Sequence, residues 1–156
     1  MTNEPLKFHV HALDGDVLAR VRASGVDVSN NPVVRVAADG GEPLRCCLRD
    51  AKPGEALILF GHEPPLGSPS PYREIGAVFA HAEPCAGPPA GYPAAWRGRR
   101  QVLRAYDRRG WIVGAVVHDG SDPEAEIARL LADPAAVQLH SRNVAYGCFM
   151  FAVTRA

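Results

Sequence analysis

Prolines concentrate in one stretch of the chain and limit the regular structure that can form there. Eight of the 14 prolines lie between Pro64 and Pro93. Proline has no backbone N–H and is rare inside helices and central strands. We therefore expect residues 63–99 to form loops that contain a single strand, Ile75 to Ala82. Loops of this length within a compact domain are more often functional than accidental.

The residues before this stretch predict short strands and one helix. Leu6, Phe8 and Val10 alternate with polar residues, which is typical of a half-buried strand. Asp14 is suited to cap a helix that ends at Gly25. The remaining predicted strands in this part are Val33–Val36, Leu44–Arg49 and Glu55–Phe60. We expect the last two to form a hairpin around residues 51–54.

The residues after it predict a hairpin, a helix and two strands. Asp107 and Gly110 stand at the first and last positions of a type I turn between the strands 101–106 and 111–117. Ser121 or Asp122 caps the helix, with Pro123 in its first turn. Strands follow at 137–140 and 146–153. The second is apolar on both faces, which predicts a central strand in which Gly147 is a packing position.

This pattern of elements predicts an α+β fold. About seven or eight strands and two helices form mainly antiparallel sheet. A length of 156 residues favours a single globular domain over residues 1–156.

Charge and hydropathy argue against two classes of partner. Lys plus Arg and Asp plus Glu each number 17, so no net charge favours nucleic acid or an anionic membrane. The longest apolar run, residues 56–61, is too short to span a bilayer. The first nine residues lack the pattern of a signal peptide. We therefore predict a cytoplasmic protein with reduced thiols and neither a nucleic-acid nor a membrane partner.

Four polar residues, His140 to Asn143, precede the predicted central strand. Extended backbone places His140 and Arg142 on the same face. Arg142 is suited to bind an anion, His140 to transfer a proton near neutral pH, and Asn143 to donate to an oxyanion. The alternative is a structural loop in which these groups pair internally.

Two further residues carry candidate chemistry in the proline-rich stretch. Glu74 is a candidate general base, although a salt bridge to Arg73, Arg104 or Arg142 is the interpretation that we favour. His81 is a candidate catalytic residue at the end of the predicted strand, or a half-buried structural histidine.

The cysteines raise the question of a metal or a thiol nucleophile. His81 and Cys85 have an acceptable spacing for zinc, with His140 or Cys148 to complete the set. No Cys-x2-Cys pair occurs, and we expect the adjacent Cys46–Cys47 to point to opposite faces of a strand. Cys85 as a nucleophile activated by His81 has no supporting signature. We therefore assign no metal ligand and no cofactor, and keep zinc at His81 and Cys85 as a third interpretation.

Four segments resemble a known family. They are residues 45–55, residues 70–81 together with Cys85, residues 104–112 and residues 140–149. In this order they resemble the bacterial family called domain of unknown function 1203. The resemblance covers most of the chain and implies a single-domain protein. It brings no mechanism.

The functional prediction is a protein that binds a small anionic or polar molecule in a pocket lined by His and Arg, with acid–base catalysis left open. The predicted catalytic residues are His81, His140 and Glu74, and the predicted ligand-binding residues are Arg142, Asn143 and Arg104. The alternative is a non-enzymatic interaction module that forms a homodimer through its sheet edges. An enzyme requires the two histidines to face one concavity, whereas a module leaves them dispersed.

Overall fold

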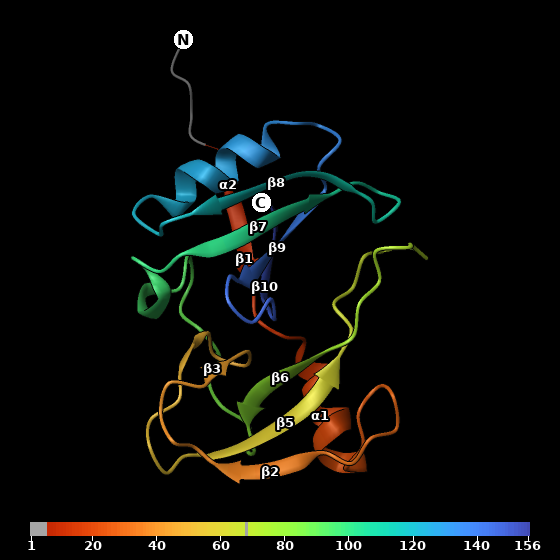
Figure 1. The fold of residues 1–156 in the computed structure, drawn as a ribbon, viewed down its shortest axis with the longest axis vertical. Coiled ribbons are helices and arrows are strands. Elements are labelled where there is room, and N and C mark those ends of the chain that lie inside the picture. The colour runs from red at the N-terminus through yellow and green to blue at the C-terminus, as the bar shows by residue number, and fades with distance from the viewer. Residues whose placement is uncertain (1–5, 68) are drawn as a thin grey trace.

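A computed structural model describes residues 6–67 and 69–156, which form two halves, each built on a five-stranded sheet (Figure 1). The upper sheet is antiparallel throughout, in the order β1-β10-β9-β7-β8. Its strands are β1 (Phe8–His11), β7 (Gln101–Tyr106), β8 (Ile112–His118), β9 (Gln138–Asn143) and β10 (Phe149–Arg155). The lower sheet has the order β2-β5-β6-β3-β4, in which the pair β3 and β6 is parallel. Its strands are β2 (Val34–Ala37), β3 (Pro43–Leu44), β4 (Arg49–Asp50), β5 (Ala56–His62) and β6 (Gly76–His81).

Each sheet has its own helix and its own apolar core. The helix α1 (Gly15–Ser24) belongs to the lower half, and its buried Leu18 and Val21 join the core of that half. The helix α2 (Pro123–Leu131) covers one face of the upper sheet with Ile127 and Leu131. A short 3-10 helix, η1 (Ala94–Trp96), adds the buried Trp96 to the upper core.

The chain passes from the upper half to the lower half and back. The strand β1 pairs with β10, with Phe8 opposite Arg155. The next six elements, α1 and β2 to β6, lie in the lower half, and η1 with β7 to β10 returns the chain to the upper half (Figure 1).

The β3–β4 turn (residues 45–48) connects the two halves through side chains. The buried Arg45 donates from Nε to the carbonyl oxygen of Phe149 at 2.8 Å. Leu48 packs in the upper core, although its neighbours in sequence belong to the lower sheet. Directly after the turn, Asp50 accepts a hydrogen bond from Trp96 Nε1 at 3.0 Å. This turn therefore belongs to both cores.

The predicted α+β class with mainly antiparallel sheet is confirmed, and the described residues form ten strands in place of seven or eight. The predicted helices and the hairpin of β7 and β8 are also confirmed. Asp14 caps α1, Asp122 caps α2, and Gly25 ends α1 in the left-handed region at φ 71°.

Two local predictions are wrong. Residues 44–49 do not pair with residues 55–60, because the chain turns back after Leu44 and β5 instead pairs with β2 and β6. Gly147 is not a packing position in a strand: it lies in the β9–β10 loop at φ 72°, with open space where a side chain would be. Residues 146–148, which the alternation pattern assigned to the strand, lie instead in the loop of residues 144–148.

No helix in the described part of the chain is long and apolar enough to span a membrane. The prediction that the chain has no signal peptide rests on its first nine residues. Residues 1–5 of these lie outside the described residues. Cytoplasmic residence and the single-domain assignment stay predictions.

Candidate metal centre

The two ends of β6 carry two separate clusters of polar side chains. His81 ends the strand, and Glu74 lies two residues before its start. A six-residue strand separates its ends by about 16 Å. We call the first group the cysteine cluster (Cys46, Cys47, His81 and Cys85). The second group is the arginine cluster (Glu74, Arg104 and Arg142).

The cysteine cluster has the dimensions of a tetrahedral metal shell. One potential ligand atom from each of its four residues lies within 4.8 Å of all the others. The Nδ1 atom of His81 is 3.4 Å from Cys46 Sγ and 3.8 Å from Cys47 Sγ, and these sulfurs are 3.9 Å apart. Tetrahedral zinc places thiolate sulfurs about 3.8 Å apart and a sulfur and an imidazole nitrogen about 3.5 Å apart. The spacings among Cys46, Cys47 and His81 fit this shell.

A turn brings the two adjacent cysteines to one side. The prediction that Cys46 and Cys47 point to opposite strand faces is wrong, because they lie in the β3–β4 turn and not in a strand. The turn closes with a hydrogen bond from the Leu48 amide to the Leu44 carbonyl, with Leu48 at φ 55°. Side chains do not alternate in such a turn, so both sulfurs face His81.

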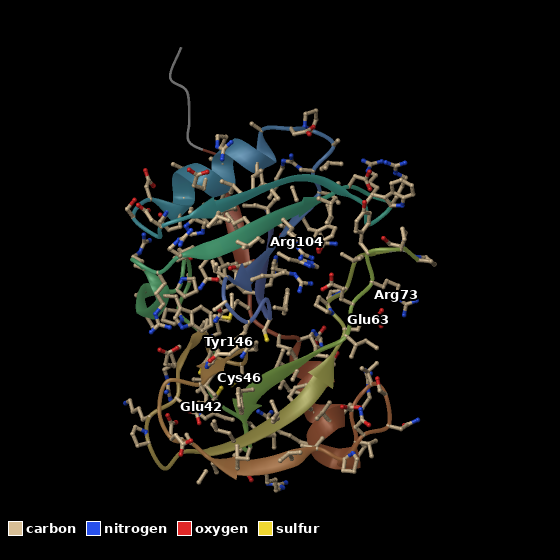
Figure 2. All side chains as sticks on the ribbon, in the orientation of Figure 1. Glu42, Cys46, Glu63, Arg73, Arg104 and Tyr146 are labelled. Atoms are coloured by element: carbon tan, nitrogen blue, oxygen red, sulfur yellow. The ribbon has the colours of Figure 1, made fainter. Side chains whose placement is uncertain are left out.

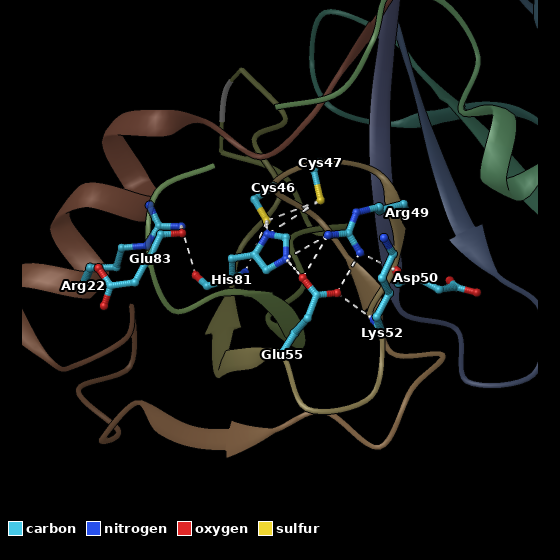
Figure 3. A network of polar contacts seen from close by, with 9 residues as sticks. All are labelled: Arg22, Cys46, Cys47, Arg49, Asp50, Lys52, Glu55, His81 and Glu83. Atoms are coloured by element: carbon cyan, nitrogen blue, oxygen red, sulfur yellow. Dashed lines mark hydrogen bonds and ion pairs between the residues drawn. The ribbon is translucent and has the colours of Figure 1, made fainter. Parts of the chain in front are cut away.

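The third and fourth members come from the end of β6 and the loop that follows. The backbone N–H of His81 donates to Cys46 Sγ at 3.2 Å. From α1, Arg22 donates to the carbonyl oxygens of His81 at 3.0 Å and Glu83 at 3.3 Å (Figure 3). Cys85 follows in the same loop and is exposed. The cluster therefore joins segments that are distant in sequence.

A carboxylate fixes the orientation of the His81 ring. Glu55 Oε2 lies 2.7 Å from His81 Nε2, while Arg49 binds both oxygens of Glu55 at 2.8 and 2.9 Å (Figure 3). Arg49 Nη2 lies farther from the same ring nitrogen, at 3.3 Å, so Glu55 is the partner that fixes the ring. With the proton on Nε2, the lone pair of Nδ1 faces the cysteines. Metal-binding histidines commonly donate their other N–H to a carboxylate in this way.

Electrostatics in the cluster favour the charged forms of Glu55 and of one thiol, Cys46. Hydrogen bonds from Arg49 and from the Lys52 amide hold the pKa of Glu55 well below its usual range. The Cys47 thiol and the His81 amide donate to Cys46 and lower its pKa to about 5. The same pairing with Cys46, together with burial, raises the pKa of Cys47. Cys46 is thus the first thiolate of the cluster, and the thiolate is the form that binds metal.

The arginine cluster consists of one carboxylate shared by two guanidinium groups. Glu74 Oε1 is 3.2 Å from Arg104 Nη1, and Glu74 Oε2 is 2.9 Å from Arg142 Nη1. The Glu74 side chain is 47% exposed and the Arg142 side chain 8%. The predicted salt bridge from Glu74 to these arginines is confirmed. In Figure 2, Arg104 lies on the side of β7 toward the lower half.

His140 is buried beside this cluster. Its ring centroid lies 4.6 Å from that of Tyr106 and 5.2 Å from that of Phe149, and its Nε2 lies 3.0 Å from Gln138 Oε1. Burial, and then the nearby Arg142, lower the pKa of His140 to about 4. The ring is therefore neutral at pH 7, and its role in acid–base catalysis stays a prediction.

The structure does not bring His81, His140 and Arg142 into one pocket. His140 and Arg142 share a face of β9 in the upper sheet, whereas His81 ends a strand of the lower sheet. Neighbouring strands bring their ends together only within one sheet, and β6 and β9 belong to different sheets. Asn143 lies apart from both clusters: it accepts a hydrogen bond from the Ala145 amide and lines a cavity of about 620 Å³ between the halves.

Sequence analysis missed Cys46 and Cys47 as partners of His81, and it missed Glu55 entirely. The available signal was the Cys-Cys pair itself, directly before Leu-Arg-Asp-Ala-Lys-Pro-Gly-Glu. His140 and Cys148, which had been considered to complete a zinc site, lie outside the cluster.

Residues 41–155 match the family described as "protein of unknown function (DUF1203)". The chain belongs to this family. The matched residues include every member of the cysteine and arginine clusters. Neither the curated proteins nor the solved structures contain a match to the chain.

Proposed function

We propose that the protein binds one zinc ion through Cys46, Cys47, His81 and Cys85. A single observation carries the proposal: four ligand atoms from a turn, a strand end and a loop converge within 4.8 Å of one another. Three thiolates and one imidazole are among the ligand sets of structural zinc sites.

The donor set favours zinc over other common ions. Thiolates and imidazole are soft or borderline ligands, whereas magnesium and calcium require oxygen. A complete set of four protein ligands leaves no position for water or substrate, which is characteristic of structural sites. We therefore propose a structural role for the ion.

The position of the cluster defines what the ion would hold together. Cys46 and Cys47 lie in the β3–β4 turn, whose Leu48 packs in the upper core. His81 and Cys85 lie at the end of β6 and in the loop that leads toward the upper half. The ion would fix this turn against the lower sheet, and its binding energy would contribute directly to folding.

Metal analysis of the purified protein tests the proposal. We expect one equivalent of zinc, and after exchange with cobalt(II) the absorption bands of a tetrahedral thiolate complex. Cys46→Ser, Cys47→Ser and Cys85→Ser should each weaken metal binding. Cys148→Ser is the matched control, because Cys148 Sγ lies 3.8 Å from the Tyr146 carbonyl oxygen and outside the cluster. Equal loss in all four variants, or no bound metal, would contradict the proposal.

Two other sequence predictions are independent of the metal. The first is binding of a small anionic molecule, which would involve the arginine cluster. The second is homodimer formation through the sheet edges, which stays a prediction. Light scattering on the protein as it elutes from a size-exclusion column measures its molar mass and tests it.

A further inference from the structure

We propose that the arginine cluster is a binding site for the carboxylate group of a small molecule, and that Glu74 occupies the position of that carboxylate in this structure. This proposal goes beyond metal binding and rests on different residues. Three observations support it: the balance of charge, the free donors of Arg142 and the adjoining cavity.

The cluster contains more positive than negative charge. Arg104 and Arg142 share the single carboxylate of Glu74. The nearby histidines do not add charge at pH 7, because burial lowers the pKa of both His62 and His140. One positive charge therefore remains without a partner beside the buried Arg142, which favours binding of an anion.

Arg142 also has hydrogen-bonding capacity that the protein does not use. Its Nη1 makes both of its contacts, to Glu74 Oε2 at 2.9 Å and to the Gly147 carbonyl oxygen at 3.0 Å. Its Nε is buried and has no hydrogen-bond partner among residues 6–67 and 69–156. Buried donors are normally satisfied. The edge formed by Nε and Nη2 is not the one that Glu74 contacts, so it can serve a second polar group of a ligand whose carboxylate replaces Glu74 at Nη1.

Glu74 is the member of the cluster that is able to leave. Arg104 and Arg142 extend from neighbouring strands, β7 and β9, in the upper sheet. Glu74 lies in the exposed segment of residues 71–75, outside helix and strand. Half-exposed salt bridges contribute little to stability. A ligand that carries its own carboxylate can therefore displace Glu74 without disturbing either core.

A small cavity adjoins the cluster. Its volume is about 150 Å³, and its lining includes His62, Glu74, Ile75, Arg142 and Phe149. This volume equals about five water molecules in the liquid, so it accommodates a ligand of few heavy atoms. A short carboxylic acid fits this space, with its apolar part against Ile75 and Phe149.

Calorimetric titration with succinate tests the proposal, with inorganic phosphate as the second arm. Removal of the internal competitor in Glu74→Ala should tighten succinate binding by about two- to fivefold relative to the unmodified protein. Loss of a charge-assisted hydrogen bond in Arg142→Ala should weaken it by roughly 10- to 100-fold. Arg104→Ala should act in the same direction and serves as the readout if Arg142→Ala fails to fold. Arg129→Ala, an exposed arginine on α2 paired with Glu126, is the matched control and should bind as the unmodified protein does.

The opposite results overturn the proposal. If Glu74→Ala melts at a lower temperature and succinate neither binds nor restores it, Glu74 is a permanent structural partner of the two arginines. If phosphate binds more tightly than succinate, the assignment to a carboxylate is wrong. Zinc content is measured on the same samples, so failure of the metal proposal would be seen separately.

Discussion

The two ends of β6 differ in how their charges are balanced. At the His81 end, Glu55 is neutralised by Arg49 and the unused atoms are sulfurs and a ring nitrogen, which bind cations. At the Glu74 end, two guanidinium groups share one carboxylate and the unused atom is an N–H donor, which binds anions. One strand thus separates a site suited to a cation from a site suited to an anion. The following predictions test whether the two ends are independent.

The largest expected effect is on the cysteine cluster. Removal of zinc with a strong chelator at pH 7 should lower the melting temperature by about 8–16 °C. A ligand at a thousand times its Kd contributes about 4 kcal/mol, and each kcal/mol shifts the melting temperature of a chain of this size by about 2–4 °C. Calorimetry with and without chelator measures the shift. Zinc removal should lower the melting temperature of Arg104→Ala by the same amount. A different change would show that the two ends of β6 are coupled.

A matched pair of substitutions compares the two carboxylates. Glu55→Gln should weaken zinc binding by about 10- to 100-fold, because it removes the charged acceptor that orients the His81 ring. Glu74→Gln should leave zinc binding unchanged. Competition with a chromophoric chelator measures both affinities. Equal weakening of zinc binding by the two substitutions would mean that Glu55 acts only through its negative charge and not by orienting the His81 ring.

The pH dependence of stability tests the Glu74 end of β6, where His140 is buried beside the arginine cluster. The pKa of His140 is about 4 in the folded protein and about 6.5 in the unfolded chain. The unfolded chain therefore takes up the proton first, and stability that is present above pH 6.5 is lost as the pH falls toward 4. Between pH 7 and pH 5 the free energy of unfolding should fall by about 2 kcal/mol from this group.

His140→Gln should remove the part of the fall in the free energy of unfolding that comes from His140. Acid also releases metal by protonating its ligands, so both proteins are compared by urea unfolding in the presence of chelator. Identical slopes for the two proteins would show that His140 takes up its proton in the folded state.

The smallest expected effect concerns the loop that accepts a hydrogen bond from Arg142. Gly147→Ala should lower the free energy of unfolding by about 1 kcal/mol, because φ is 72° there and L residues are strained at that angle. Added atoms meet open space, so overpacking does not contribute. Gly147→Asn should cost less, since asparagine tolerates this region. A loss several times larger in urea unfolding would restore the packing interpretation.

Sequence analysis succeeded where the structure is determined locally. Asp14 and Asp122 cap their helices because the carboxylate reaches an amide two or three residues ahead. Gly110 ends its turn at φ 76°, within hydrogen-bond distance of Asp107. The pairing of Glu74 with Arg104 and Arg142 is the exception, a distant contact that was predicted because charged groups in a folded protein are usually paired.

Sequence analysis failed where distant contacts decide the structure. The strands β3 and β4 have two residues each, too few for any periodicity. The β3–β4 turn has its shape because Leu48 packs in the upper core, a contact with residues that follow much later in the chain. The partners of His81 depend on that turn. Alternation within a segment also does not reveal to which sheet a strand belongs, so His81 and His140 were expected to meet.

The pairing of β1 with β10 has a consequence for how the protein forms during synthesis. All strands of the lower sheet and α1 precede residue 82, so the ribosome delivers the lower half complete while the upper half lacks four of its five strands. Phe8 must then remain without its partner until Arg155 emerges. Closing so long a loop is slow relative to local contacts. During that interval the backbone of β1 and its apolar Phe8 and Val10 lack their partners, and this is the part of the nascent chain that a chaperone would protect.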